Sequence, residues 1–194
     1  MRINTPSQNM GFSAKDIYGN SFSLKRLRGK RVLLAFFRDA ACPFCHLRVY
    51  EITQNYQRWK EQNLEVVAVF SDTSSQVRRF VAQHPRPFTI LADPNLQLYN
   101  HFGVETSGAA LLKALLLKLP RIVKGFWLGA KPSNNPHVTL VPADFLFNEA
   151  GVLEHAWYGS NTSDHLPLAE IQSFINEGRS RISITAGALA SVAK

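Results

Sequence analysis

Two nearly continuous apolar runs, Arg31–Phe37 and Leu64–Phe70, restrict how this chain can fold more than any other feature of its sequence. Runs of this kind are typical of strands that are covered on both faces of a sheet. A long stretch with helical character, from Pro43 to about Gln62, separates them. The sequence therefore predicts a buried sheet whose strands alternate with helices.

The rest of the chain continues this alternation. A hairpin with a turn at Gly19-Asn20 precedes the first run, and a second hairpin turns at Asn148–Gly151. The other expected elements are a helix over 74–84, a strand over 88–91, a helix between Asp93 and Gly103, strands over 143–147 and 152–158, and a last helix over 164–177. We expect an α/β sandwich around a mixed sheet, folded as one domain of 194 residues.

The segment 106–141 does not follow that alternation. It combines a leucine- and lysine-rich stretch, ALLKALLLKL, with an aromatic turn and a polar loop. We interpret it as a helical insertion within the domain. An extra helix that covers one end of the core is the simplest interpretation. The alternatives are a surface for dimerisation and a lid that covers or borders the site described below.

The chain is basic, because 22 Lys and Arg against 14 Asp and Glu give a formal net charge of +8. Basic charge permits contact with nucleic acid or anionic lipid, but these charges are spread as ordinary solvated faces. The longest apolar stretch, Ala109–Leu119, is about half the length that spans a bilayer. The N-terminus lacks the apolar core of an export signal. We expect a cytoplasmic protein with no nucleic-acid partner and no membrane partner.

The two cysteines stand in the sequence Cys42-Pro-Phe-Cys45, where the first buried strand runs into a helix. Cys42 is expected at the N-cap, at the exposed end of the helix, with Pro43 at the first helical position and Cys45 under the first turn. Free N–H groups and the helix dipole favour the reactive thiolate there. The spacing lets the second sulfur attack a mixed disulfide formed by the first. The motif predicts a redox cycle through a Cys42–Cys45 disulfide, with no cofactor.

Two other chemistries share this pattern. Cys42-x-x-Cys45-His46 also matches the attachment site of c-type haem, which requires export, and it offers three adjacent zinc ligands without a second pair at suitable spacing. We therefore assign no metal site. His46 is expected on the first helical turn, where its charge would favour the thiolate. The histidines at 101, 137, 155 and 165 share no spacing, and none is given a role.

Three further segments carry recognisable signatures: DIYGNSFSL with LRGK, LADP with FGV, and DFLFNEAG. Together with the cysteine motif, they resemble the thioredoxin-like superfamily in its peroxiredoxin-like branch, the alkyl hydroperoxide reductase/thiol-specific antioxidant (AhpC/TSA) proteins. The likeness runs from Gly11 to Ile175, apart from the insertion. It implies a thioredoxin-like sandwich, an antioxidant thiol-dependent oxidoreductase, and a thiol donor such as a thioredoxin or glutathione system.

The sequence differs from that family at the positions that support peroxide activation there. Its members share a Pro-x-x-x-Thr/Ser-x-x-Cys loop; with Cys45 as the peroxidatic cysteine, Arg38 replaces the proline and Cys42 replaces the threonine. The family's second arginine falls at Pro142. Thioredoxin-type disulfide reductases instead have Cys-x-x-Cys and a cis-proline at the start of the same strand. This second pattern implies that Cys42 attacks, Cys45 resolves, and a cis Pro142 orients the substrate.

Three charged residues are expected to support the cysteines. Arg38 raises the local positive potential, and Asp39 relays protons or orients Arg38. A simple salt bridge at a loop corner is an equal alternative for this pair. Asp144 is expected inside a strand beside Pro142, where it acts as a buried proton acceptor or binds the backbone.

These observations lead us to expect a thiol-disulfide oxidoreductase that acts on disulfide or peroxide substrates. Two alternatives stay open. One is a thiol peroxidase that reduces hydroperoxides through Cys45 or Cys42. The other is a non-catalytic redox sensor or partner-binding module. The oligomeric state is also open, and a homodimer is one outcome.

Overall fold

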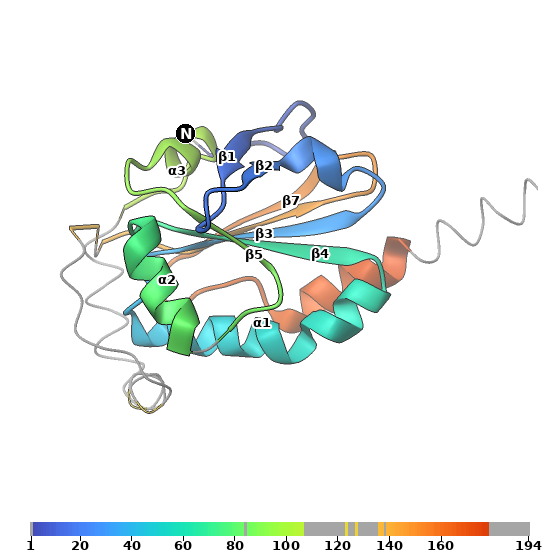
Figure 1. The fold of residues 1–194 in the computed structure, drawn as a ribbon. Helices are drawn as coiled ribbons and strands as arrows, with labels where there is room; N and C mark the ends of the chain where they lie inside the picture. Colours follow the sequence, from blue (N-terminus) through green and yellow to red (C-terminus); the bar gives the residue numbers. More distant parts are fainter. Residues whose placement is uncertain are drawn as a thin grey trace, which may run out of the picture.

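A five-stranded mixed sheet forms the centre of the molecule (Figure 1). The computed structural model describes residues 2–83, 85–106, 123, 127, 136–137 and 139–178. The strands, in the order in which they lie in the sheet, are β5 (Thr89–Ala92), β4 (Leu64–Phe70), β3 (Arg31–Phe37), β6 (Ala143–Phe147) and β7 (Leu153–Tyr158). β3, β4 and β5 run parallel, whereas β6 is antiparallel to β3 and to β7. The expected mixed sheet is confirmed.

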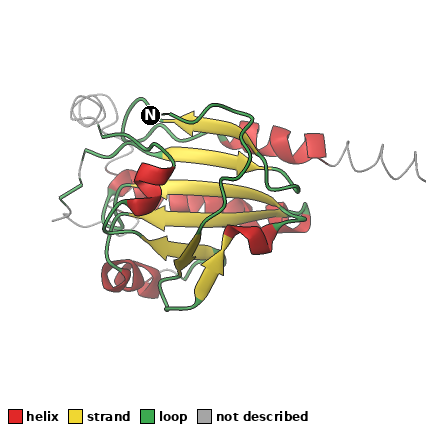
Figure 2. Ribbon diagram, turned by 90° about the horizontal axis from the view of Figure 1, so that it is seen from above, coloured by secondary structure: helices red, strands yellow, loops and turns green. Residues whose placement is uncertain are grey.

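Helices cover one face of this sheet, and shorter elements cover the other (Figures 1 and 2). The first layer holds α1 (Pro43–Glu61), α2 (Ser74–Gln83) and the helical residues 168–178. The second layer holds the hairpin of β1 (Ser13–Lys15) and β2 (Ser21–Ser23), the 3-10 turn Leu24–Leu27, and α3 (Gln97–His101).

The central strand β3 explains this layering. All seven of its residues are buried, as expected of a strand covered on both faces. Alternate side chains point to opposite faces of a strand. Leu33, Ala35 and Phe37 therefore pack in the core beneath α1, while the side chains between them pack against the layer of α3. The C-terminal end of β3 leads directly to the cysteines.

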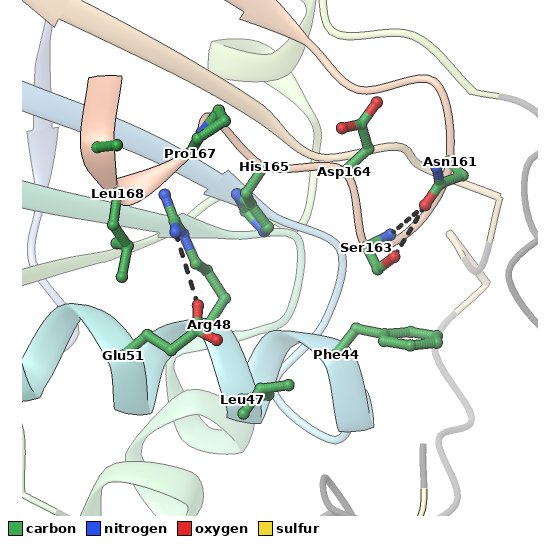
Figure 3. Close-up of a pocket in the computed structure, with 11 residues that line it drawn as sticks. Phe44, Leu47, Arg48, Glu51, Asn161, Ser163, Asp164, His165, Pro167 and Leu168 are labelled. Atoms are coloured by element: carbon green, nitrogen blue, oxygen red, sulfur yellow. Dashed lines mark hydrogen bonds and ion pairs between the residues drawn. The ribbon is translucent and has the colours of Figure 1, made fainter. Parts of the chain in front are cut away.

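The last helix begins later than the sequence predicts. Its helical residues start at 168, not at Asp164. Asp164 looks like a helix cap in the sequence. Instead, its carboxylate accepts hydrogen bonds from the N–H and hydroxyl of Ser160, at 2.7 and 2.6 Å, and closes the turn of residues 160–164 that precedes it in the chain. The residues between Asp164 and the helix form a loop that packs over α1 (Figure 3).

Most of the expected insertion, 106–141, lies outside the described residues. Thr106 and Leu140 pair in an isolated antiparallel bridge, so the two ends of the segment lie side by side. The interpretation of the segment as an insertion stays a prediction. In the part of the chain that the structure describes, no helix is both long and apolar enough to cross a membrane.

Candidate active site

A five-residue loop, 38–42, connects β3 to α1 and carries the first cysteine. Cys42 occupies the N-cap of α1 with an extended backbone, and Pro43 is the first helical residue. The N–H of His46 donates to the Cys42 carbonyl at 3.0 Å and closes the first turn. Cys45 follows within this turn. The expected placement of both cysteines at the start of a helix is confirmed.

Both cysteines are free thiols and both are buried. Cys42 is 1% exposed and Cys45 is 3% exposed. The expectation that Cys42 lies at an exposed helix end is therefore wrong. The loop folds back over the helix start, so Ala40 and Phe44 join both cysteines in the apolar core.

Arg38 directly contacts the first sulfur. Its Nη2 donates a hydrogen bond to Cys42 Sγ at 2.9 Å. Its Nε lies 3.6 Å from Oδ2 of Asp39, whose side chain is buried. The other carboxylate oxygen of Asp39 accepts the N–H of Ala41 at 2.7 Å. Asp39 thus forms the expected ion pair and also shapes the loop that brings Arg38 to Cys42.

A second loop, directly after β4, holds the first one in place. The hydroxyl of Ser71 donates to the Arg38 carbonyl, and Oδ2 of Asp72 accepts the Ala40 N–H at 2.5 Å. Both side chains are buried. Because β3 and β4 are parallel neighbours, the loops that follow them meet at the same edge of the sheet. These two residues are not among those predicted from the sequence, although a Ser-Asp pair directly after a buried strand is a visible signal.

Tyr99 also positions the site and was missed. Its hydroxyl lies 2.5 Å from the Phe37 carbonyl and 3.1 Å from the Val69 carbonyl, so it links the C-terminal ends of β3 and β4. The side chain is 1% exposed. Only the tertiary structure shows this role, since both carbonyls belong to the backbone.

The two thiols differ in acidity. Burial opposes ionisation of Cys42, but a hydrogen bond from Cys45 and the positive charge of Arg38 outweigh it and lower the pKa of Cys42 to about 7. Burial raises the pKa of Cys45, and the hydrogen bond to Cys42 raises it further. Cys42 is therefore the more easily ionised of the two thiols, and Cys45 keeps its proton at neutral pH.

This difference predicts the order of alkylation. With reduced protein, iodoacetamide should label Cys42 first, with a midpoint near pH 7. At pH 7 about half of a thiol with this pKa is ionised, against roughly 3% of an ordinary thiol. Peptide mapping by mass spectrometry as a function of pH measures both quantities. Faster labelling of Cys45 at neutral pH would contradict the assignment and move the attacking role to the second cysteine.

The expectation for Pro142 is corrected. The Val141–Pro142 peptide bond is trans; within the described residues, the cis bond joins Thr5 and Pro6. Pro142 stands directly before β6, and its carbonyl accepts the N–H of Gly159 at 2.9 Å, an ordinary role at a strand entry. The proposed cis-proline for substrate orientation is therefore wrong for this structure.

Asp144 and His46, two further residues singled out in the sequence, contact groups outside the cysteine pair. Asp144 is fully buried on β6, where it binds His165 and the Leu166 N–H instead of a cysteine. The His46 ring packs against Phe80, and its Nε2 lies 2.7 Å from the Ala40 carbonyl. Among the described residues, no group of three or more His, Cys, Asp or Glu side chains is arranged to hold a metal ion.

Comparison with known proteins agrees with this geometry. The family model of the AhpC/TSA family matches residues 7–156. The chain belongs to the AhpC/TSA family. This confirms the peroxiredoxin-like resemblance, which the sequence carried in the segments around β1–β2, β5 and β6 as well as in the cysteine motif.

Individual relatives of this AhpC/TSA chain are distant. A peroxiredoxin Q from chloroplasts of Sedum lineare is 29% identical over 49% of this chain and 51% of its own. The thiol-disulfide oxidoreductase ResA of Halalkalibacterium halodurans is 30% identical over 54% of this chain and 60% of its own. The chain thus spans about half the length of the curated relatives it matches.

The fold likeness extends further than the sequence likeness. The crystal structure of peroxidoxin BcpB from Mycobacterium tuberculosis superposes with a TM-score of 0.65 at 14% identity, covering 92% of this chain and 98% of that one. The expected thioredoxin-like sandwich is confirmed.

Proposed function

We propose that this chain is a thiol-dependent oxidoreductase that reduces disulfides through Cys42, with a Cys42–Cys45 disulfide as its oxidised form. One observation carries the proposal: a buried thiol with a pKa near 7, held by Arg38, lies beside a second thiol that stays protonated. The first can attack a substrate disulfide, and the second can release the product. AhpC/TSA membership and the likeness to a thiol-disulfide oxidoreductase support this assignment.

A thiol donor must then restore the dithiol. In the oxidised protein the two cysteines form one internal disulfide. Its reduction takes two electrons, which an external thiol or dithiol supplies through disulfide exchange. A thioredoxin or glutathione system has this chemistry. The cycle uses the two cysteines alone and needs no organic cofactor. The cytoplasmic location and the homodimer stay predictions.

A second candidate function is peroxide reduction. The guanidinium of Arg38, 2.9 Å from the Cys42 sulfur, is placed to stabilise negative charge that develops on a peroxide oxygen attacked there. The matched peroxiredoxin Q relative supports this candidate as well. In both candidates Cys42 is the attacking residue and Cys45 the resolving one.

Comparison of two substrates tests the proposal. Wild-type protein should reduce insulin disulfides with dithiothreitol as the donor, well above a Cys42→Ser/Cys45→Ser double variant measured at the same concentration. Consumption of hydrogen peroxide and of an organic hydroperoxide is followed in parallel. Peroxide consumption without disulfide reduction would replace the first candidate by the second. Activity on neither substrate would leave the redox sensor or partner-binding module as the interpretation and refute the enzymatic proposal.

A further inference from the structure

A second group of buried polar side chains lies against Phe37, the residue before the cysteine loop, and has no part in the chemistry described above. Asp144 is fully buried on β6, and Nδ1 of His165 lies 2.9 Å from its Oδ2 and 3.2 Å from its Oδ1. The N–H of Leu166 donates to the same Oδ2 at 2.7 Å. A buried carboxylate that is bound so closely fixes both the position and the orientation of the imidazole.

The protonation of this pair follows from its surroundings. Burial alone would raise the pKa of Asp144, but His165 and the nearby Arg48 outweigh burial and hold this pKa below its ordinary value. Asp144 is therefore an anion, and Nδ1 of His165 must carry the proton that the carboxylate accepts. Nε2 lies on the edge of the ring that faces away from Asp144.

His165 lies beside the cysteine loop. Its ring packs against Phe37, the last residue of β3, with 5.0 Å between the ring centroids. It also lines a pocket of about 510 Å³, whose floor is the start of α1 and whose opposite wall is the loop 161–167 with the residues that follow it (Figure 3). Phe44, which stands between the two cysteines in the chain, lines the same pocket. The pocket therefore adjoins the Cys42–Cys45 motif.

The charged groups around this pocket are already partnered. Arg48 donates from Nη2 to the Leu166 carbonyl at 2.6 Å and lies 3.6 Å from Glu51, while Asp164 accepts two hydrogen bonds from Ser160. These contacts hold the loop against α1. His165 is partnered through Nδ1 alone, since no described residue forms a hydrogen bond with its Nε2. Its side chain is only 6% exposed, so the ion pair with Asp144 and the surrounding pocket wall both fix the ring.

We propose that this pocket binds the leaving half of an aliphatic disulfide and that His165, held by Asp144, gives its proton to the departing sulfur. The inference rests on the proposed disulfide reductase function and adds a substrate class and a catalytic residue to it. An ionised carboxylate on Nδ1 stabilises the imidazolium that such a step requires, as in other Asp–His pairs. The apolar part of the lining, Phe44, Leu47, Pro167 and Leu168, would contact the carbon chain of the leaving thiol.

The proposed reaction balances in two steps. The Cys42 thiolate attacks one sulfur of R–S–S–R′, the substrate S–S bond breaks, and the departing R′S⁻ takes the proton from Nε2 of His165. Cys45 then attacks the Cys42 sulfur, and its own proton goes to the second departing thiolate. The substrate is reduced to RSH and R′SH, the protein is oxidised to the Cys42–Cys45 disulfide, and His165 regains its proton from solvent.

The need for a proton depends on the leaving thiol, and this gives a selective test. An aliphatic thiolate is basic and leaves slowly unless it is protonated, whereas an acidic aromatic thiolate leaves readily without help. The two probes are 2-hydroxyethyl disulfide, with aliphatic thiols, and 5,5′-dithiobis(2-nitrobenzoic acid), with acidic aromatic thiols. Single-turnover rates of the reduced protein are measured for both probes as a function of pH.

His165→Gln should slow reduction of the aliphatic probe by on the order of a hundredfold, the usual size of a lost general acid, and change the aromatic probe by only a few fold. Asp144→Asn should act in the same direction, because the imidazole loses its anion. His155→Gln, which removes an exposed histidine on β7, serves as the matched control and should leave both rates unchanged. Circular dichroism and the melting temperature of each variant are recorded beside the rates.

The outcomes separate this inference from the proposed function. Selective loss with the aliphatic probe supports it. An equal loss with both probes, or no loss, shows that the Asp144–His165 pair only ties the loop to the sheet and overturns it. Should wild-type protein reduce neither probe, the proposed function fails, and the inference fails with it.

Discussion

Replacement of Cys42 by serine is expected to abolish disulfide reduction, lowering the rate by on the order of a thousandfold or more, because a hydroxyl cannot replace the thiolate. Our proposal gives the attack to Cys42, whose pKa lies near 7, and not to Cys45, whose pKa is raised by burial and by the hydrogen bond to Cys42. Stopped-flow measurement of the first turnover with an excess of disulfide gives the rate directly.

Replacement of Cys45 by serine should have a different effect. Cys42 still attacks, but no second sulfur releases the product, so a mixed disulfide between Cys42 and the substrate accumulates. Non-reducing mass spectrometry detects it as an added substrate mass that dithiothreitol removes. The double serine variant is the control for non-specific labelling. A stable mixed disulfide on Cys45 in the Cys42→Ser variant, formed at the wild-type rate, would reverse the two roles.

Features that depend on local sequence were predictable. β3 and β4 span Arg31–Phe37 and Leu64–Phe70, the same bounds as the two apolar runs, because burial on both faces leaves a continuous signal in the sequence. The start of α1 was also predictable, since a proline at the first helical position marks it clearly. The fold class followed from the order of such elements.

Features that depend on contacts between distant segments could not be predicted from the sequence. Ser71 reaches the Arg38 carbonyl across 33 positions, and His165 meets Asp144 across 21 positions, so neither pair has a spacing that could reveal it. The burial of Cys42 also depends on a distant segment, because Ser71 and Asp72, in the loop after β4, hold the loop 38–42 in place. The isomer of Pro142 was wrongly predicted for a related reason: the trans preference of an X–Pro bond is only about 0.5–1 kcal/mol, so tertiary contacts decide it.

Arg38 should control the reactivity of Cys42. Its Nη2 contacts the sulfur at 2.9 Å, and its charge helps to outweigh the burial that opposes ionisation. Without this cation, the pKa of Cys42 should move from about 7 to the ordinary thiol value of about 8.5 or above, since desolvation then acts with less opposition. Arg38→Met should therefore reduce the thiolate present at pH 7 about tenfold or more.

The direction of the pH dependence makes this prediction specific. The wild-type thiolate is present above pH 7 and is lost as the pH falls through that value, whereas the Arg38→Met thiolate should already be lost as the pH falls below about 8.5. Ultraviolet absorbance of the thiolate and the pH profile of alkylation measure the shift. Arg79→Met, which removes an exposed arginine on α2, is the matched control.

Removal of Arg38 alone also leaves the buried Asp39 carboxylate without its ion-pair partner, which costs about 3–5 kcal/mol of stability in typical buried pairs. Arg38→Met/Asp39→Asn removes both charges and keeps the measurement interpretable if the single variant unfolds. Asp39 raises the pKa of Cys42 in the wild type, so the double variant should titrate below the single one while staying above the wild type. A double variant that titrates at the wild-type value would show that the hydrogen bond from Cys45 and the start of α1 lower this pKa without help from Arg38.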